Sequence, residues 1–130
     1  MNTETIADCM KASFADTPFP AVVQRLHGAG VHSYRADLMK LRTTYYDAGA
    51  QAFDEDIPLS AAPRVAVAFA PDAIAATVKA VQRKEIGYAE FLRRIMANGC
   101  ASYEVFFGGR KAVYVGRDGD VYIEPFPQPA

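Results

Sequence analysis

The residue best placed for chemistry is Cys100, which follows Asn98-Gly99 and opens a predicted strand. A cysteine acts as a nucleophile when its pKa is lowered and a base lies within reach. His32, at the start of another predicted strand, is the candidate base, and Asp37 the group that would orient it. The alternative is a small buried thiol with no chemical role, which is the commoner outcome for such a residue.

Two tyrosines in each half of the chain are placed to face each other across a predicted hairpin. Buried phenols need hydrogen-bond partners, and a shared polar cavity would supply them. Polar residues of the first strand would line the rim of that cavity. The alternative is ordinary packing of the sheet, with the hydroxyls reaching solvent. The candidate binding residues are Tyr34, Tyr45, Tyr103, Tyr114, His32, Arg35 and Asp37.

No metal site or cofactor is expected. His27 and His32 are five residues apart, which does not put two imidazoles on one helical face. Asp54-Glu55-Asp56 lacks the alternating oxygen ligands and the glycine of a calcium loop. Neither Gly28-Ala29-Gly30 nor Gly108-Gly109 follows a strand and opens a helix, as a phosphate-binding loop requires.

Composition narrows the class of protein further. The 130 residues predict one domain, and 51% hydrophobic residues are enough for a sizeable core. A net charge of −1 gives no basic face for nucleic acid. Without a signal-peptide pattern, an apolar run of membrane-spanning length or a CxxC pair, the chain is expected to be soluble and cytoplasmic, with no membrane partner.

The elements that would position these residues are clearest from residue 98 to residue 127. Three strands rich in Tyr, Val, Phe and Ile are separated by Gly108-Gly109 and Asp118-Gly119, which suit hairpin turns. If both turns are two-residue loops, Tyr103 faces Tyr114, and Tyr114 faces Ile123 on the helix-covered side of a sheet. The apolar residues left on the exposed side would be Val113, Val115 and Tyr122.

The preceding chain reads as helices and strands in the same order. A first helix stops before Asp16, and a second ends at Gly28-Ala29-Gly30 and is followed by strands over 31–38, 42–46 and 51–54. Residues 59–69 form a linker, in which Val65–Phe69 is compatible with a strand or a helical turn. Two further helices precede Asn98, the first beginning near Asp72.

The two halves of the chain resemble each other. A shift of 69 residues lays Ser33 on Ser102, Tyr34 on Tyr103 and Tyr45 on Tyr114. We therefore predict an internal duplication of a helix-helix-meander unit. The halves 1–58 and 70–127 would be joined by the linker 59–69 within a single domain, 1–130, because each unit alone is too small to close a core.

The C-terminal segment Phe91–Pro127, FLRRIMANGCASYEVFFGGRKAVYVGRDGDVYIEPFP, resembles a family of uncharacterised small bacterial proteins labelled "phage envelope protein". Phe19-Pro20, the stretch 30–38 (GVHSYRADL) and Thr44-Tyr45-Tyr46 extend the resemblance over nearly the whole chain. The resemblance implies a connection to a viral structure but no activity.

The sequence thus predicts an α+β domain with about four helices covering one face of an antiparallel sheet. We predict a non-catalytic module that forms a homodimer or binds a small molecule or a protein. The alternatives are a small enzyme that uses Cys100 with His32 and a phage-derived structural protein.

Overall fold

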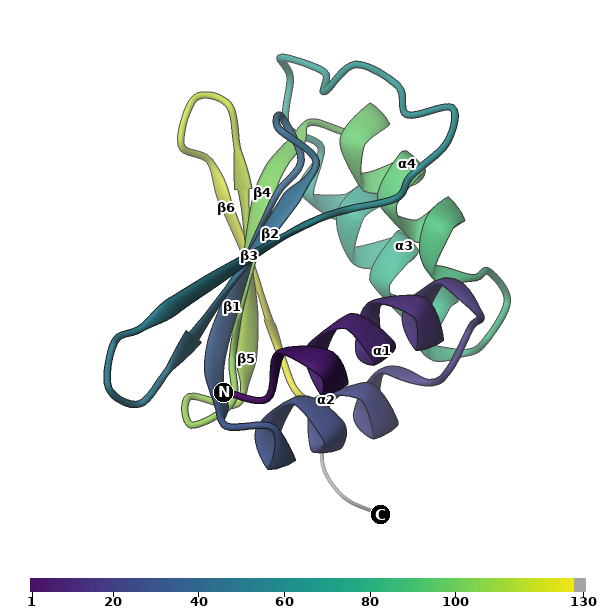
Figure 1. Cartoon of the computed structure of the whole chain (residues 1–130). Coiled ribbons are helices and arrows are strands. Elements are labelled where there is room, and N and C mark those ends of the chain that lie inside the picture. The colour runs from purple at the N-terminus through teal and green to yellow at the C-terminus, as the bar shows by residue number, and fades with distance from the viewer. Residues whose placement is uncertain (128–130) are drawn as a thin grey trace.

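Four helices lie on one face of a six-stranded sheet in the computed structural model, which describes residues 1–127 (Figure 1). The predicted α+β class is therefore confirmed. The last three residues of the predicted domain, 128–130, lie outside the described part. The helices are α1 (Thr3–Phe14), α2 (Phe19–Gly28), α3 (Pro71–Gln82) and α4 (Tyr88–Ala97). The strands are β1 (Val31–Asp37), β2 (Arg42–Asp47), β3 (Ala52–Asp56), β4 (Cys100–Phe106), β5 (Lys111–Gly116) and β6 (Val121–Pro125).

The sheet is antiparallel throughout, with the strand order β3-β2-β1-β4-β5-β6. Each half of the chain supplies three consecutive strands joined by short turns. The halves meet where β1 pairs with β4 at the centre of the sheet. Because this pair is antiparallel, the start of each central strand lies beside the end of the other.

Alternation along the strands separates a buried face from an outer face. On β4, Tyr103 and Val105 are buried, and on β5 Ala112 and Tyr114 are buried. The α4 residue Phe91 packs edge-on against the rings of Tyr103 and Tyr114, with centroid distances of 6.2 and 6.4 Å. The buried face is thus the one under the helices, and the other face carries no helix.

The two halves repeat the same elements at a fixed interval. The bounds of β1, β2, β3 and α2 reappear 69 residues later as those of β4, β5, β6 and α4, and α1 reappears 68 residues later as α3. Residues with positive φ recur as well: Gly30 and Gly99 have φ values of 92° and 94°, and Leu41 and Arg110 have 54° and 53°. The repeat is a property of the backbone, whereas its origin in an ancestral duplication stays a prediction.

The β4–β5 hairpin has the predicted register, with Tyr103 opposite Tyr114. Its turn differs from the expectation, because the positive φ falls on Arg110 and not on Gly108 or Gly109. The β5–β6 hairpin contradicts the predicted register. The Gly116 N–H bonds Asp120 O at 2.8 Å, which makes a three-residue loop, 117–119, in place of a two-residue one.

The extra loop residue reverses the faces of β6. Tyr114 lies opposite Tyr122, not Ile123, and Val113 lies opposite Ile123. Tyr122 therefore points toward the helices, and Ile123 points to the outer face with half of its surface exposed (50%). A shift of one residue exchanges every side chain between the faces of a strand. The predicted placement of these two residues was wrong for that reason.

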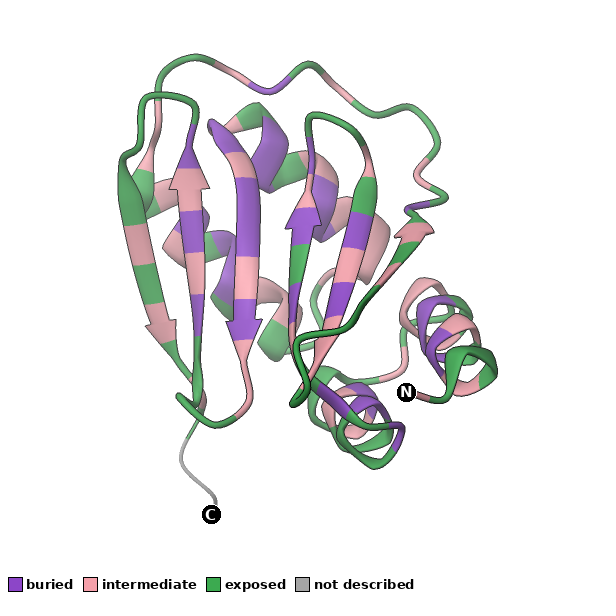
Figure 2. Cartoon of the chain, turned by 60° about the vertical axis from the view of Figure 1, so that its left-hand side comes forward, coloured by how far each residue is buried: buried purple, intermediate pink, exposed green. Residues whose placement is uncertain are grey.

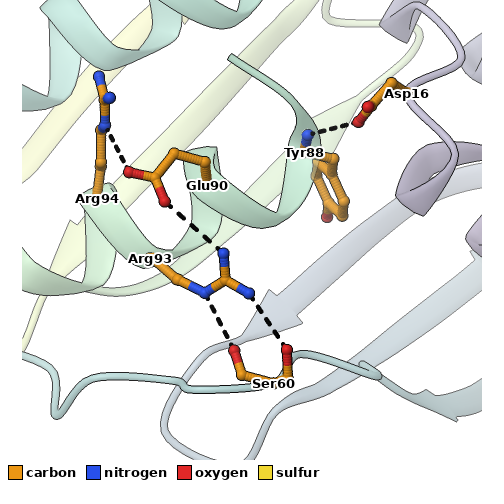
Figure 3. A network of polar contacts seen from close by, with 6 residues as sticks. All are labelled: Asp16, Ser60, Tyr88, Glu90, Arg93 and Arg94. Atoms are coloured by element: carbon orange, nitrogen blue, oxygen red, sulfur yellow. Dashed lines mark hydrogen bonds and ion pairs between the residues drawn. The ribbon is translucent and has the colours of Figure 1, made fainter.

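The connection from β3 to α3 runs over 57–70 without regular secondary structure, which settles Val65–Phe69 as neither strand nor helix. Arg93 of α4 holds the beginning of this connection, because the Nε of Arg93 donates to Ser60 O at 3.0 Å (Figure 3). Glu90 forms an ion pair with the same guanidinium. The N-terminus of α4 is tied to the first half, since Tyr88 N donates to Asp16 Oδ1 at 3.3 Å.

Candidate functional site

The structure does not bring Cys100 and His32 together. Ser33 pairs with Phe106 and Asp37 pairs with Ser102, so β1 and β4 run in opposite directions. Cys100 opens β4 and His32 is the second residue of β1, so about seven residues, or ~23 Å, separate them along the sheet. The predicted thiol-imidazole pair is therefore not formed by this fold.

Cys100 is itself a buried, protonated thiol. Its Sγ donates to Ser102 O at 3.2 Å, and its side chain has no exposed surface. Burial raises the pKa of the Cys100 thiol to about 12, and hydrogen bonding with the backbone of Val115 and Ser102 lowers it by less. At neutral pH such a thiol is not a nucleophile.

The predicted tyrosines do come together, in a row of aromatic rings under the helices. The row crosses all six strands, with successive ring centroids between 5.4 and 6.4 Å apart. Tyr34, Tyr45, Tyr103 and Tyr114 form its middle, and each is at most 8% exposed. The row consists of Phe53, Tyr45, Tyr34, Tyr103, Tyr114 and Tyr122.

Tyr103 and Tyr122 of this row make hydrogen bonds through their hydroxyls. Tyr88 of α4 lies over the row, with its hydroxyl oxygen 2.5 Å from that of Tyr103, and Tyr122 donates to Glu124. Burial raises the pKa of the Tyr88 hydroxyl to about 12 and that of Tyr103 well above its usual value. These phenols stay neutral at physiological pH and do not act as bases.

The polar residues expected at the rim of a tyrosine cavity are elsewhere. Arg35 follows Tyr34 directly and so leaves β1 on the outer face, where it is exposed. His32 is also exposed. Asp37 ends the strand, where its Oδ1 accepts the backbone N–H groups of Met39 and Lys40 at 3.0 and 3.1 Å. The structure therefore places Arg35 on the face opposite the tyrosine row and Asp37 at the strand end, and the binding role of His32, Arg35 and Asp37 stays a prediction.

The outer face of the sheet carries a feature that the sequence located only in part. Val113 lies opposite Ile123, and Val115 lies opposite Val121, so that two cross-strand aliphatic pairs adjoin on β5 and β6. Val121 is 51% exposed, close to the value for Ile123. We call these four residues the outer apolar patch. Figure 2 looks onto this face, with α3 and α4 behind the sheet.

A hollow that the sequence did not predict lies where α2 leads into β1. Its volume is about 360 Å³, and a second hollow of about 420 Å³ shares His32, Phe107 and Gly108 with it. We call the first the α2–β1 hollow. It is lined by His27, Gly30, Val31, His32, Ala48, Phe107 and Gly108.

Both histidines of the chain, His27 and His32, border this hollow. Among residues 1–127, no group of three or more His, Cys, Asp or Glu side chains is placed to hold a metal ion. The same part of the chain has no helix with the length and apolar composition needed to cross a bilayer.

Comparison with models of known protein families and with curated proteins finds no match for this chain. The resemblance to the phage-envelope family therefore stays a prediction. The outer apolar patch and the α2–β1 hollow are two surface features from which a function can be proposed.

Proposed function

We propose that the protein is a non-catalytic module that self-associates through the outer face of its sheet, with the outer apolar patch at the centre of the contact. The exposure of Val121 and Ile123 beside Val113 and Val115 is the observation that carries this proposal. Burying such adjoining aliphatic side chains against a second copy removes apolar surface from water. The same patch on each copy suits a twofold interface, in which a surface contacts itself.

The first half of the repeat shows what this face looks like without such a role. The counterpart of the Val113–Ile123 pair is Thr44–Asp54, in which the Thr44 hydroxyl donates to Asp54 Oδ1 at 2.5 Å. Asp56 extends this polar surface through an ion pair with Arg42 at 3.2 Å. Aliphatic residues are therefore not needed on this face to form the strands, and their presence on β5 and β6 needs another reason.

The edges of the sheet are less suited to association than its face. The edge strand β3 carries Asp54-Glu55-Asp56, and the other edge strand, β6, ends at Pro125 with Pro127 beyond it. Charged residues and prolines on edge strands oppose pairing with another chain. Stacking of two outer faces is therefore the favoured geometry.

The size of the face predicts a weak dimer. The half of the sheet that carries the patch has three strands, ~4.8 Å apart and each about five residues long, which give a face of about 250 Å². Two such faces together bury about 500 Å², which is below the size of stable protein interfaces and typical of weak association. We therefore expect an equilibrium between monomer and dimer that depends on concentration.

Sedimentation velocity from low micromolar to millimolar protein tests the proposal. Ile123→Asp should shift the equilibrium to monomer, and the fold should tolerate it because Asp54 holds the counterpart position. Ala52→Asp is the matched control: it adds the same charge at the counterpart of Val121, on the polar half, and should leave the dimer intact. A wild-type monomer at every concentration, or equal association of Ile123→Asp, would contradict the proposal.

A further inference from the structure

The α2–β1 hollow has a counterpart in the second half of the repeat, and there the place is filled. A segment of the chain's own linker, 65–69, lies across it in an irregular conformation, with Val65 buried. The helix-to-strand turns beside the two places have the same geometry, with Gly30 and Gly99 at nearly equal positive φ. One half therefore shows how the other half's hollow can be occupied.

Backbone hydrogen bonds seat the linker segment. Ala66 N donates to Met96 O at 3.1 Å, and further along Ala70 N donates to Asn98 O at 2.9 Å. Arg117 reaches from the β5–β6 turn to Val65 O at 3.5 Å. These bonds are made by main-chain atoms of the segment, so this binding place requires little of the side chains except that they are small.

Close approach explains why this binding place needs glycine. A Cβ on Gly99 would come within 2.1 Å of Ala68 O, and a Cβ on Gly116 would come within 2.8 Å of the Phe69 ring. Gly99 lets the linker backbone lie directly on the turn. Gly30 preserves this feature in the first half, where the nearest atom to its added Cβ is Met1 Cα at 3.6 Å.

The positions that hold the linker line the hollow in the other half. Subtracting 69 converts Met96 to His27, Gly99 to Gly30 and Arg117 to Ala48, all three of which border the α2–β1 hollow. The bond from Ala70 to Asn98 also has its counterpart, since Asn2 N donates to Ala29 O at 2.8 Å. Met1 and Asn2 thus take the places of Phe69 and Ala70, and the places of residues 65–68 form the hollow.

We infer that the α2–β1 hollow binds an extended peptide segment of a partner protein, with small apolar side chains, in the way that its counterpart holds 65–68. The peptide donates a backbone N–H to His27 O, as Ala66 does to Met96 O. Its chain lies on Gly30, and its far side faces Phe107, whose ring contacts His27 at a centroid distance of 6.4 Å. This site is separate from the outer apolar patch, so the two proposals stand or fall independently.

The probe is a synthetic peptide with the sequence of residues 63–68, acetyl-PRVAVA-amide, added to the ¹⁵N-labelled full chain. We expect saturable chemical-shift changes centred on His27, Gly30, Val31 and Ala48. A second peptide, acetyl-PRVPVA-amide, lacks the N–H that would bond His27 O and should produce none. The absence of saturable changes at millimolar peptide, changes confined to other surfaces, or equal binding of the proline peptide would overturn the inference.

A variant of the protein provides a gain of binding. Ala48→Arg introduces the counterpart of Arg117, whose guanidinium bonds the carbonyl of Val65. One added hydrogen bond should tighten the peptide between about twofold and tenfold. Gln51→Arg, which adds the same charge elsewhere in the β2–β3 turn region, is the matched control and should leave the affinity within about twofold. An equal gain in peptide affinity for both variants would show that the added positive charge alone is responsible, and it would contradict the proposed binding site.

Discussion

Arg35 and Glu104 lie directly opposite each other where β1 pairs with β4. They are also counterparts in the repeat, because Glu104 follows Arg35 by 69 residues. Around them Tyr34 faces Val105, and Ala36, the counterpart of Val105, faces Tyr103. The register of the central pair therefore follows a twofold relation between the halves. At its centre, one half presents a cation and the other an anion on the outer face.

This opposition predicts a charge-coupled pair. Arg35→Glu places two carboxylates opposite each other, and Glu104→Arg places two guanidinium groups there. Each single change should lower the free energy of unfolding by about 0.2–1 kcal/mol, and the double exchange should recover most of the loss. Urea denaturation at low salt measures the cycle. Strictly additive effects of the two substitutions would show that the pair is not coupled.

The turns between the outer strands provide a second matched pair. Ala50 has a φ of 63° and Gly119, its counterpart, a φ of 87°. A residue with a Cβ is strained in this left-handed region by about 1 kcal/mol relative to glycine. Ala50→Gly should therefore stabilise the protein and Gly119→Ala should destabilise it, each by about that amount. Opposite signs in thermal denaturation test this, and equal signs would contradict it.

The register of β6 shows where sequence reasoning fails. Asp118-Gly119 suits a two-residue turn, but it suits equally a three-residue loop that ends in a left-handed glycine, which the structure contains. Both place glycine at positive φ, so local chemistry does not distinguish them. The one-residue difference decides whether Tyr122 or Ile123 faces the helices, and with it the composition of the outer apolar patch.

Whether a feature could be predicted from the sequence depended on whether local or tertiary structure determines it. The Tyr103–Tyr114 pair followed from short-range pairing, which depends on one turn only. The distance from Cys100 to His32 depended on the direction in which β1 and β4 pair, a tertiary property. The α2–β1 hollow could not be predicted, because it exists where the linker 59–69 packs on the second half and leaves the matching place in the first half open. The one sequence feature related to it is the recurrence of glycine at positions 30 and 99.

The buried state of Cys100 predicts an inert thiol. With a pKa raised to about 12 by burial, Cys100 should react with a disulfide reagent far more slowly than a model thiol at neutral pH, and Cys9 is buried as well. Reaction of both thiols should appear on unfolding. Cys100→Val, which copies the counterpart Val31, should cost less than about 1.5 kcal/mol. Rapid labelling of the native protein that Cys100→Val abolishes would contradict this picture.

Glu55 predicts a pH dependence of stability. Its Oε1 is buried without a hydrogen-bond partner, and desolvation raises the pKa of this carboxyl above 4.5, partly offset by Lys11. The native state therefore holds the proton more tightly than the unfolded state, and the contribution of Glu55 to stability falls as pH rises from below 4.5 through the raised pKa.

Glu55→Gln should remove that fall. It should be more stable than wild type at neutral pH, by up to about 1 kcal/mol since the side chain is partly exposed to solvent, and the gain should vanish at low pH where Glu55 is protonated. Glu124→Gln is the control, because the counterpart Glu124 accepts the Tyr122 hydroxyl and its replacement weakens a charge-assisted hydrogen bond. Urea midpoints of the three proteins between pH 4 and pH 8 make the comparison. A gain for Glu55→Gln that is the same at every pH would place its cause outside the titration of this carboxyl.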